Sequence, residues 1–146
     1  MNFGDDLYRE IILENYKSKK NKRPLEDANH HEEGVNPSCG DDVELFMKVV
    51  DGTIEDVTYD GVGCSICLAA ANMLCEALRG ATITRAMELI GRFKGMLLEG
   101  AEPDFPDDLG DLEAMQGVRK FPVRIKCALL SWNTAEQILK PELAGE

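Results

Sequence analysis

The chain has 146 residues and a formal net charge of −11, with 27 acidic and 16 basic side chains. This length fits one compact domain with a substantial hydrophobic core, and we expect residues 1–146 to form a single domain. Nonspecific binding to nucleic acid is not expected. A phosphate backbone attracts clustered lysine and arginine, and here these residues are scattered among more numerous acids.

Two features of the sequence indicate a cytoplasmic protein with no membrane partner. Residues 1–6 are polar and acidic, unlike a secretory signal. The longest uncharged stretch, residues 61–75, is shorter than the roughly 20 apolar residues of a membrane helix. The five cysteines are odd in number. In a reducing compartment, metal binding or thiol chemistry explains them better than disulfides.

The N-terminal part predicts a helix followed by a loop. Residues 5–16 have the periodicity of an amphipathic helix, and Pro24 closes the basic run that follows it. Residues 25–37 are polar and lack periodicity, which indicates a loop with at most one short strand. The apolar face of the helix is expected to consist of Tyr8, Ile11, Ile12 and Tyr16.

The next segment predicts a β-hairpin. Residues 43–50 and 54–59 form two strand-like runs joined by Asp51-Gly52, a dipeptide typical of tight hairpin turns. This places Cys39 and Asp41 just before the hairpin and Cys64 just after it.

The remainder predicts mainly helices. Helices are expected over residues 65–79, 83–98 and 122–139, with Pro141 ending the last one. Between them, residues 99–113 carry seven acids and predict an exposed loop that leads into a short helix. Because strands and helices are segregated along the chain, the order indicates the α+β class. The inward face of the last helix is expected to contain Val123, Cys127, Leu130 and Ile138.

Four of these residues can form a metal site. The Cys39-Gly40-Asp41 spacing lets a thiolate and a carboxylate point toward one ion. Cys64 is expected at a helix start, where the macrodipole favours a thiolate, and Cys127 lies near the start of another helix. If these segments converge, three sulfurs and one oxygen complete a four-coordinate site. Zinc accepts such ligands, and so do iron–sulfur clusters.

Two cationic side chains lie beside the last of these residues. Three thiolates and one carboxylate would carry four negative charges, of which a divalent ion neutralises two. Arg124 and Lys126, close to Cys127 in the sequence, are placed to offset the remainder. A protonated lysine has no lone pair, so Lys126 is expected to tune the site rather than to bind the metal.

Blander interpretations stay open for each cysteine and histidine. A single cysteine is often only a small buried apolar residue, and Cys75 is expected to be core. Cys64 and Cys67 form a C-x-x-C motif, which suits a redox dithiol or a pair of metal ligands. The βαβ context of thioredoxin-like dithiols is not expected, so Cys67 is interpreted as a helix-face thiol able to accept sulfur from a neighbour. His30 and His31 are expected to be solvated in the polar loop rather than bound to metal.

Three motifs resemble those of a known family. The segment NPSCGD at residues 36–41 is similar to the N-P-x-C-G-D box of iron–sulfur scaffold proteins, the IscU/NifU N-terminal family. The segments GCSI at residues 63–66 and FPVRIKC at residues 121–127 are similar to its second and third cysteine boxes. Lys126 before the last cysteine, and the long interval between the second and third boxes, resemble the SufU branch, whose members are zinc-dependent sulfur-transfer proteins.

The resemblance implies an IscU/SufU-like domain with a small antiparallel three-stranded sheet packed by about five helices. It implies a zinc ion held by Cys39, Asp41, Cys64 and Cys127. It also implies a pyridoxal-phosphate cysteine desulfurase of the SufS type as partner, with further iron–sulfur assembly proteins downstream. In this branch the residue corresponding to Cys39 leaves the zinc and accepts persulfide sulfur, so Cys39 is the expected catalytic residue.

The same resemblance leaves the function open between three hypotheses. The first is a zinc-bound sulfur acceptor, a sulfurtransferase that acts only together with the desulfurase. The second is a scaffold on which a [2Fe–2S] cluster is assembled on the same four ligands and passed to apo-proteins. The third is a purely structural zinc domain, which an aspartate ligand makes less attractive.

Overall fold

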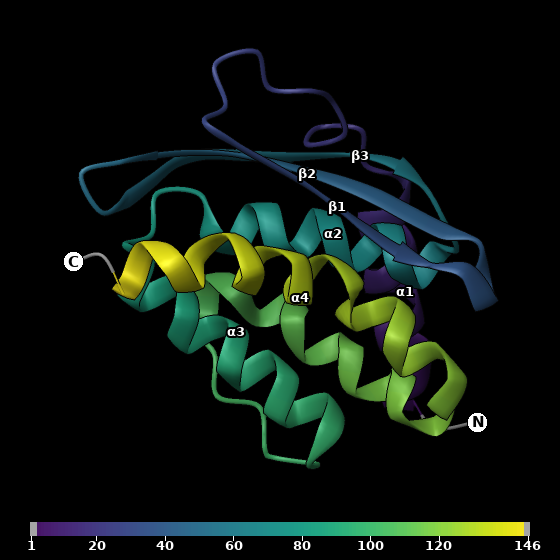
Figure 1. Cartoon of the computed structure of the whole chain (residues 1–146). Helices are drawn as coiled ribbons and strands as arrows, with labels where there is room; N and C mark the ends of the chain where they lie inside the picture. Colours follow the sequence, from purple (N-terminus) through teal and green to yellow (C-terminus); the bar gives the residue numbers. More distant parts are fainter. Residues whose placement is uncertain (1–2, 145–146) are drawn as a thin grey trace.

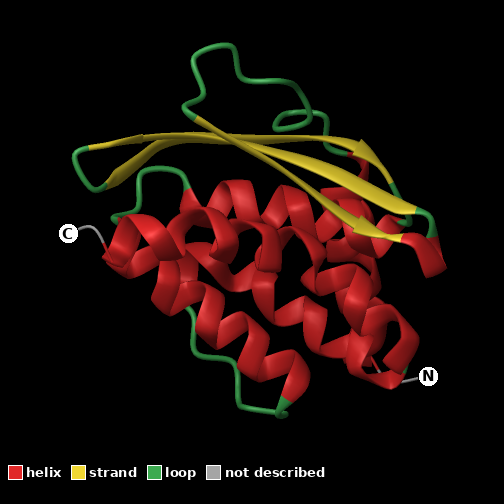
Figure 2. Ribbon diagram, viewed as in Figure 1, coloured by secondary structure: helices red, strands yellow, loops and turns green. Residues whose placement is uncertain are grey.

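A three-stranded antiparallel sheet lies against one side of a group of helices in the computed structural model, which describes residues 3–144 (Figures 1 and 2). Four α-helices and a long 3-10 segment make up the helical side, so the predicted α+β class, sheet and helix number are confirmed. Along these residues no helix is both long and apolar enough to cross a membrane. The elements are α1 (Phe3–Lys17), β1 (His30–Asn36), η1 (Pro37–Cys39), β2 (Asp41–Val50), β3 (Thr53–Val62), α2 (Ser65–Leu78), α3 (Ile83–Leu98), η2 (Asp107–Lys120) and α4 (Pro122–Ala144).

The predicted hairpin forms β2 and β3. Asp51 and Gly52 both adopt positive φ, at 51° and 75°, as a turn that matches the twist of an antiparallel pair requires. Both strands are longer than predicted, because pairing continues to Asp42 opposite Val62. Asp41 therefore belongs to β2, in register with Asn36 of β1, instead of preceding the hairpin.

The expected loop over residues 25–37 contains a full strand. β1 spans seven residues and pairs with β2 along its length, so His30 and His31 lie in a strand and not in a loop. The sequence showed no alternation there because β1 is an edge strand with mostly exposed or half-exposed side chains. Its structure depends on pairing with β2, which local periodicity does not record.

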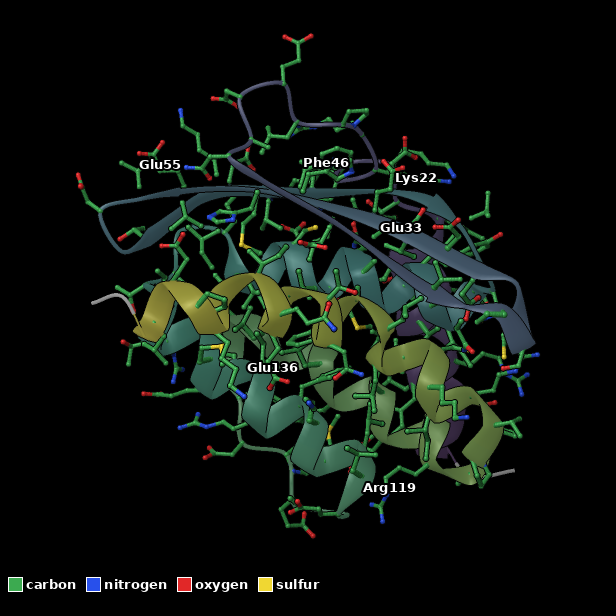
Figure 3. The ribbon with its side chains drawn as sticks, viewed as in Figure 1. Lys22, Glu33, Phe46, Glu55, Arg119 and Glu136 are labelled. Atoms are coloured by element: carbon green, nitrogen blue, oxygen red, sulfur yellow. The ribbon has the colours of Figure 1, made fainter. Side chains whose placement is uncertain are left out.

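Alternation along β2 turns an apolar face toward the helices. Val43, Leu45 and Met47 are almost completely buried against them. On the other side of the sheet, Phe46 stacks on His31 with ring centroids 4.4 Å apart (Figure 3). Residues 18–29 run over this outer side (Figure 1) and are tied to β2 and β3 by backbone hydrogen bonds.

Three predictions about the later elements are wrong in detail. Pro141 does not end α4, which continues to Ala144. The carbonyl that loses its helical partner to the proline belongs to Gln137, an exposed residue, so water can replace the lost bond. Val123 is 73% exposed instead of facing inward. The acidic loop ends at residue 106. The segment η2 begins at Asp107 and is kinked at Leu109.

A buried amide occupies the last turn of the inward face of α1. Tyr16, predicted to face inward, is 37% exposed, whereas Asn15 is 8% exposed. The Asn15 side-chain oxygen accepts a 2.8 Å hydrogen bond from Asn72 of α2. Asn72 in turn accepts one of 2.9 Å from Asn21. The Asn21 oxygen accepts a 2.7 Å bond from Arg79, which also binds Asp56 of β3.

We predict that Asn72→Ala destabilises the fold by about 2–4 kcal/mol, because it leaves a buried acceptor on Asn15 and a buried donor on Asn21 without partners. Urea unfolding followed by circular dichroism measures the change. Gln137→Ala, which removes an exposed amide from α4, is the matched control and should change stability by less than about 0.5 kcal/mol. Equal effects of the two substitutions would show that the amide network contributes nothing.

Candidate metal centre

The predicted ligands meet at the end of the sheet where β1 and β3 finish, on the right in Figure 1. Cys39 is the last residue of η1, and Asp41 is the first residue of β2. Cys64 is the N-cap of α2, as its expected place at a helix start requires. Cys127 lies in the second turn of α4 and is completely buried.

Three of the four predicted ligands form one compact group. The ligand atoms of Cys39, Asp41 and Cys127 all lie within 4.8 Å of one another. Cys64 falls outside this mutual group but adjoins it, because its backbone N–H donates a 2.9 Å hydrogen bond to Asp41 Oδ1. The structure thus brings together three residues and places the fourth beside them.

Asn36, the first residue of the NPSCGD box, also belongs to the site. Its amide nitrogen lies 3.4 Å from Asp41 Oδ2 and 3.8 Å from Cys127 Sγ, as a donor to both. Its own oxygen accepts a 2.9 Å hydrogen bond from Ser38. Asn36 therefore orients two ligands without being one. The NPSCGD motif contains Asn36 but does not indicate this role.

Gly63 allows the chain to pass close to the carboxylate. A Cβ atom at this position would lie 2.8 Å from Asp41 Oδ1 and 3.2 Å from Cys67 Sγ. Real Cβ atoms almost never show a contact as short as the one with Asp41, and the one with Cys67 is tight, so any larger residue would push the carboxylate aside. The glycine is the second site feature that the sequence did not single out.

The Cys127 thiol is held in an environment that opposes its ionisation. Burial raises the pKa of the Cys127 thiol, and hydrogen bonding with Asp41, Cys39 and Cys64 raises it further. The Arg124 guanidinium lies beside the thiols of Cys64 and then Cys127, and these contacts raise the pKa of Arg124. Arg124 thus supplies part of the positive charge that the sequence predicted.

The donor set fits a zinc ion. Atoms bound to one tetrahedral zinc lie about 3.5 Å apart, which the group within 4.8 Å can reach by small side-chain adjustments. Three sulfurs and one carboxylate oxygen suit zinc or an iron–sulfur cluster better than magnesium or calcium, which prefer oxygen. A bound cation would also reverse the pKa pattern by favouring the thiolates.

Cys39 differs from the buried ligands in its access to solvent. It is half-buried and lines a surface pocket of about 590 Å³, whereas Asp41 and Cys127 are buried. The pocket is lined by Ser38, Cys39, Pro122, Val123, Arg124 and Lys126. Lys126 is exposed there, so the prediction that both cations lie at the site agrees with the geometry.

The remaining cysteines and histidines lie elsewhere or play a different part. Cys75 is completely buried in α2, as expected for core. His30 contacts Glu142 of α4 at 2.9 Å, and His31 lies 3.3 Å from Glu44 of β2, so both face acidic neighbours. Cys67 is completely buried in the first turn of α2 and is not an exposed helix-face thiol.

A family model described as the NifU-like N terminal domain matches residues 7–128. The chain belongs to this family. It is 43% identical to the "zinc-dependent sulfurtransferase SufU" of Bacillus subtilis over 97% of this chain and 95% of that protein. It is 35% identical to the "iron-sulfur cluster assembly scaffold protein IscU" of Thermotoga maritima over 92% of this chain and 93% of that protein.

Solved structures of NifU-like proteins have the same fold. A SUF-system protein of Fervidobacterium islandicum, named as an iron–sulfur cluster assembly scaffold, superposes with a TM-score of 0.82 at 38% identity, covering 89% of this chain and 94% of that one. The N-terminal domain of a NifU-like protein from Brucella abortus gives a TM-score of 0.84 at 20% identity, covering 93% and 94%, which supports the fold alone. The predicted resemblance is confirmed, and the zinc and cluster expectations agree with the relatives' names.

We predict that Gly63→Ala weakens zinc binding by at least about 10-fold, because the added methyl group displaces the Asp41 carboxylate that orients the site. Competition with a chromophoric chelator measures the affinity. Gly91→Ala is the matched control, because a Cβ at this exposed helical glycine meets open space. It should leave zinc affinity unchanged and raise stability by up to about 1 kcal/mol. Equal zinc affinity in the two variants would contradict the role of Gly63.

Proposed function

We propose that this chain is a zinc-dependent sulfur acceptor in iron–sulfur cluster assembly, and that Cys39 receives persulfide sulfur from a SufS-type cysteine desulfurase. One observation carries the proposal: Cys39 belongs to a compact thiol–carboxylate cluster and also lines a surface pocket. A relative named as a zinc-dependent sulfurtransferase matches 97% of the chain. In this proposal, residues 1–146 form one domain.

In this proposal, Cys39, Asp41, Cys64 and Cys127 hold the zinc ion. The ion would stabilise their thiolates at neutral pH and keep the sulfur-accepting thiolate bound until a donor docks. The protein supplies the orientation of these groups, since Asn36 and the Cys64 N–H fix both oxygens of Asp41. Cys127 and Asp41 have no exposure through which a donor could reach them.

Cys39 is the ligand best placed to leave. It ends η1 and is followed by Gly40, which has a φ of 69° and open space where a Cβ would lie. A segment that ends in such a glycine can change direction without moving β2. Arg124 and Lys126 line the same pocket, so the thiolates that a transfer at Cys39 consumes and releases lie near two positive charges.

The transfer step is a thiol exchange. The Cys39 thiolate attacks the outer sulfur of the donor's cysteine persulfide, a new S–S bond forms on Cys39, and the donor's S–S bond breaks. The donor cysteine leaves as a thiolate. The transferred outer sulfur keeps its proton and becomes the outer sulfur of the Cys39 persulfide, so no electrons are gained or lost overall.

The surface around the pocket suits a protein donor. Val62, Phe121 and Val123 are 65%, 59% and 73% exposed. Val62 directly precedes the second cysteine box, whereas Phe121 and Val123 belong to the third, and Val123 lines the pocket. Exposed large apolar side chains close to a polar site are typical of a protein interface. A partner covering them would also exclude water from the exposed persulfide.

The alternative is a scaffold on which a [2Fe–2S] cluster is assembled and transferred to apo-proteins. The relative from Thermotoga maritima is named a scaffold, and the same four residues would bind the cluster. Lys126 lines the pocket beside Cys39, and its place before the last cysteine resembles the SufU branch, which favours the sulfur relay. We therefore place the scaffold second.

We predict that the chain purified without oxygen contains about one zinc, and that it stimulates a SufS-type desulfurase. Cys39→Ala should abolish both the stimulation and the persulfide found on the chain by mass spectrometry. Cys75→Ala, which removes a buried thiol remote from the pocket, should retain both. Stoichiometric iron and sulfide, with stimulation unchanged in Cys39→Ala, would contradict the relay and support the scaffold.

A further inference from the structure

Cys67 lies on the buried side of the metal centre and has no part in the proposed mechanism. It is completely buried, and it lies three residues after Cys64 in the first turn of α2, so both side chains share one helix face. Its Sγ and Asp41 Oδ1 both lie within 3.2 Å of the point where a Cβ on Gly63 would be. The thiol therefore faces the carboxylate ligand across a glycine.

The surroundings of Cys67 differ from those of an ordinary core cysteine. Burial raises the pKa of the Cys67 thiol, and the charged neighbours that raise it further are Asp41, Cys64 and Cys39. Cys75, two turns along the same helix, is equally buried, but its charged neighbours are led by Arg79 and Glu76. Of these two core thiols, only Cys67 adjoins the metal centre.

Release of Cys39 creates a need that Cys67 can meet. When Cys39 leaves to carry sulfur, the remaining ligands are two thiolates and one carboxylate, and zinc keeps an open position. Cys39 approaches the cluster from the pocket, whereas Cys67 approaches it from the core. A third thiolate entering from the core would restore both the coordination number and the charge without blocking the pocket.

We propose that Cys67 is a reserve metal ligand that replaces Cys39 when Cys39 leaves the site. This inference rests on the proposed function, because it requires a zinc ion and a departing Cys39. The exchange is ligand substitution: the Cys39–zinc bond breaks, a Cys67–zinc bond forms, and the Cys67 proton passes to solvent or to the freed Cys39 thiolate. No oxidant or reductant is involved.

The test counts thiolate ligands in the full-length chain and its variants. Zn²⁺ affinity is measured by chelator competition, and Co²⁺ is used as a spectroscopic substitute whose sulfur-to-metal charge-transfer intensity increases with the number of bound thiolates. The variants are Cys39→Ala, Cys67→Ala, and the two combined. Cys39→Ala with Cys75→Ala is the matched control, since it removes an equally buried thiol from the same helix.

We expect the wild-type chain and Cys67→Ala to show three bound thiolates, those of Cys39, Cys64 and Cys127. Cys39→Ala should also show three, because Cys67 enters, and so should the control with Cys75→Ala. The combination of Cys39→Ala with Cys67→Ala should show two thiolates and bind Zn²⁺ at least about 10-fold more weakly than Cys39→Ala. Cys67→Ser, combined with Cys39→Ala, should behave in the same way while preserving side-chain volume.

Two results would overturn the inference in distinguishable ways. If Cys39→Ala shows two thiolates with or without Cys67, Cys67 is a core thiol, and the proposed function stands. If the wild-type chain binds Zn²⁺ or Co²⁺ through fewer than three thiolates, the proposed zinc site fails, and the reserve ligand fails with it. Thermal unfolding of each variant identifies any loss of metal that follows from loss of the fold.

Discussion

The Asp41 carboxylate joins the sheet to the helices at the point where the ligands meet. Asp41 is the first residue of β2, and its Oδ1 accepts a hydrogen bond from the backbone N–H of Cys64 at the start of α2. Its Oδ2 lies 3.4 Å from the amide of Asn36, which ends β1. One side chain therefore fixes a strand end, a helix start and a neighbouring strand. Without it, the start of β2 and the start of α2 would lose the side-chain hydrogen bond that joins them directly at the cluster.

The same helix is held a second time by polar contacts far from the ligands. Asn72, in the middle of α2, is bonded to α1 through Asn15 and to the segment before β1 through Asn21. Such buried amides specify one arrangement of elements, because each alternative packing leaves a donor or acceptor unpaired. The orientation of α2 sets where Cys64 and Cys67 point. The amide network thus supports the site at a distance, through the helix rather than through contact.

Local patterns predicted the elements that carry their own signals. The Asp51-Gly52 turn predicted the hairpin, and the cysteine boxes predicted four ligands, three of which form one compact group. β1 was missed because its stability comes from pairing with β2, and its exposed side chains leave no alternation. The helix continued past Pro141 because the lost hydrogen bond lies at an exposed end. Asn36 and Gly63 were missed for a different reason, since their roles are contacts across the chain that spacing does not encode.

The positions of the four cysteines around the site distinguish Cys39 from the other three as the proposed sulfur acceptor. Cys127 is completely buried and hydrogen-bonded by Asn36, and Cys67 is buried behind Gly63. Cys64 is tied through its backbone to Asp41. Cys39 alone among the four lines the described pocket and precedes a glycine with positive φ. A ligand can leave only where the chain can move and where an incoming group can reach it. In this fold both conditions coincide at Cys39, so burial supports its proposed role as sulfur acceptor as much as thiol chemistry does.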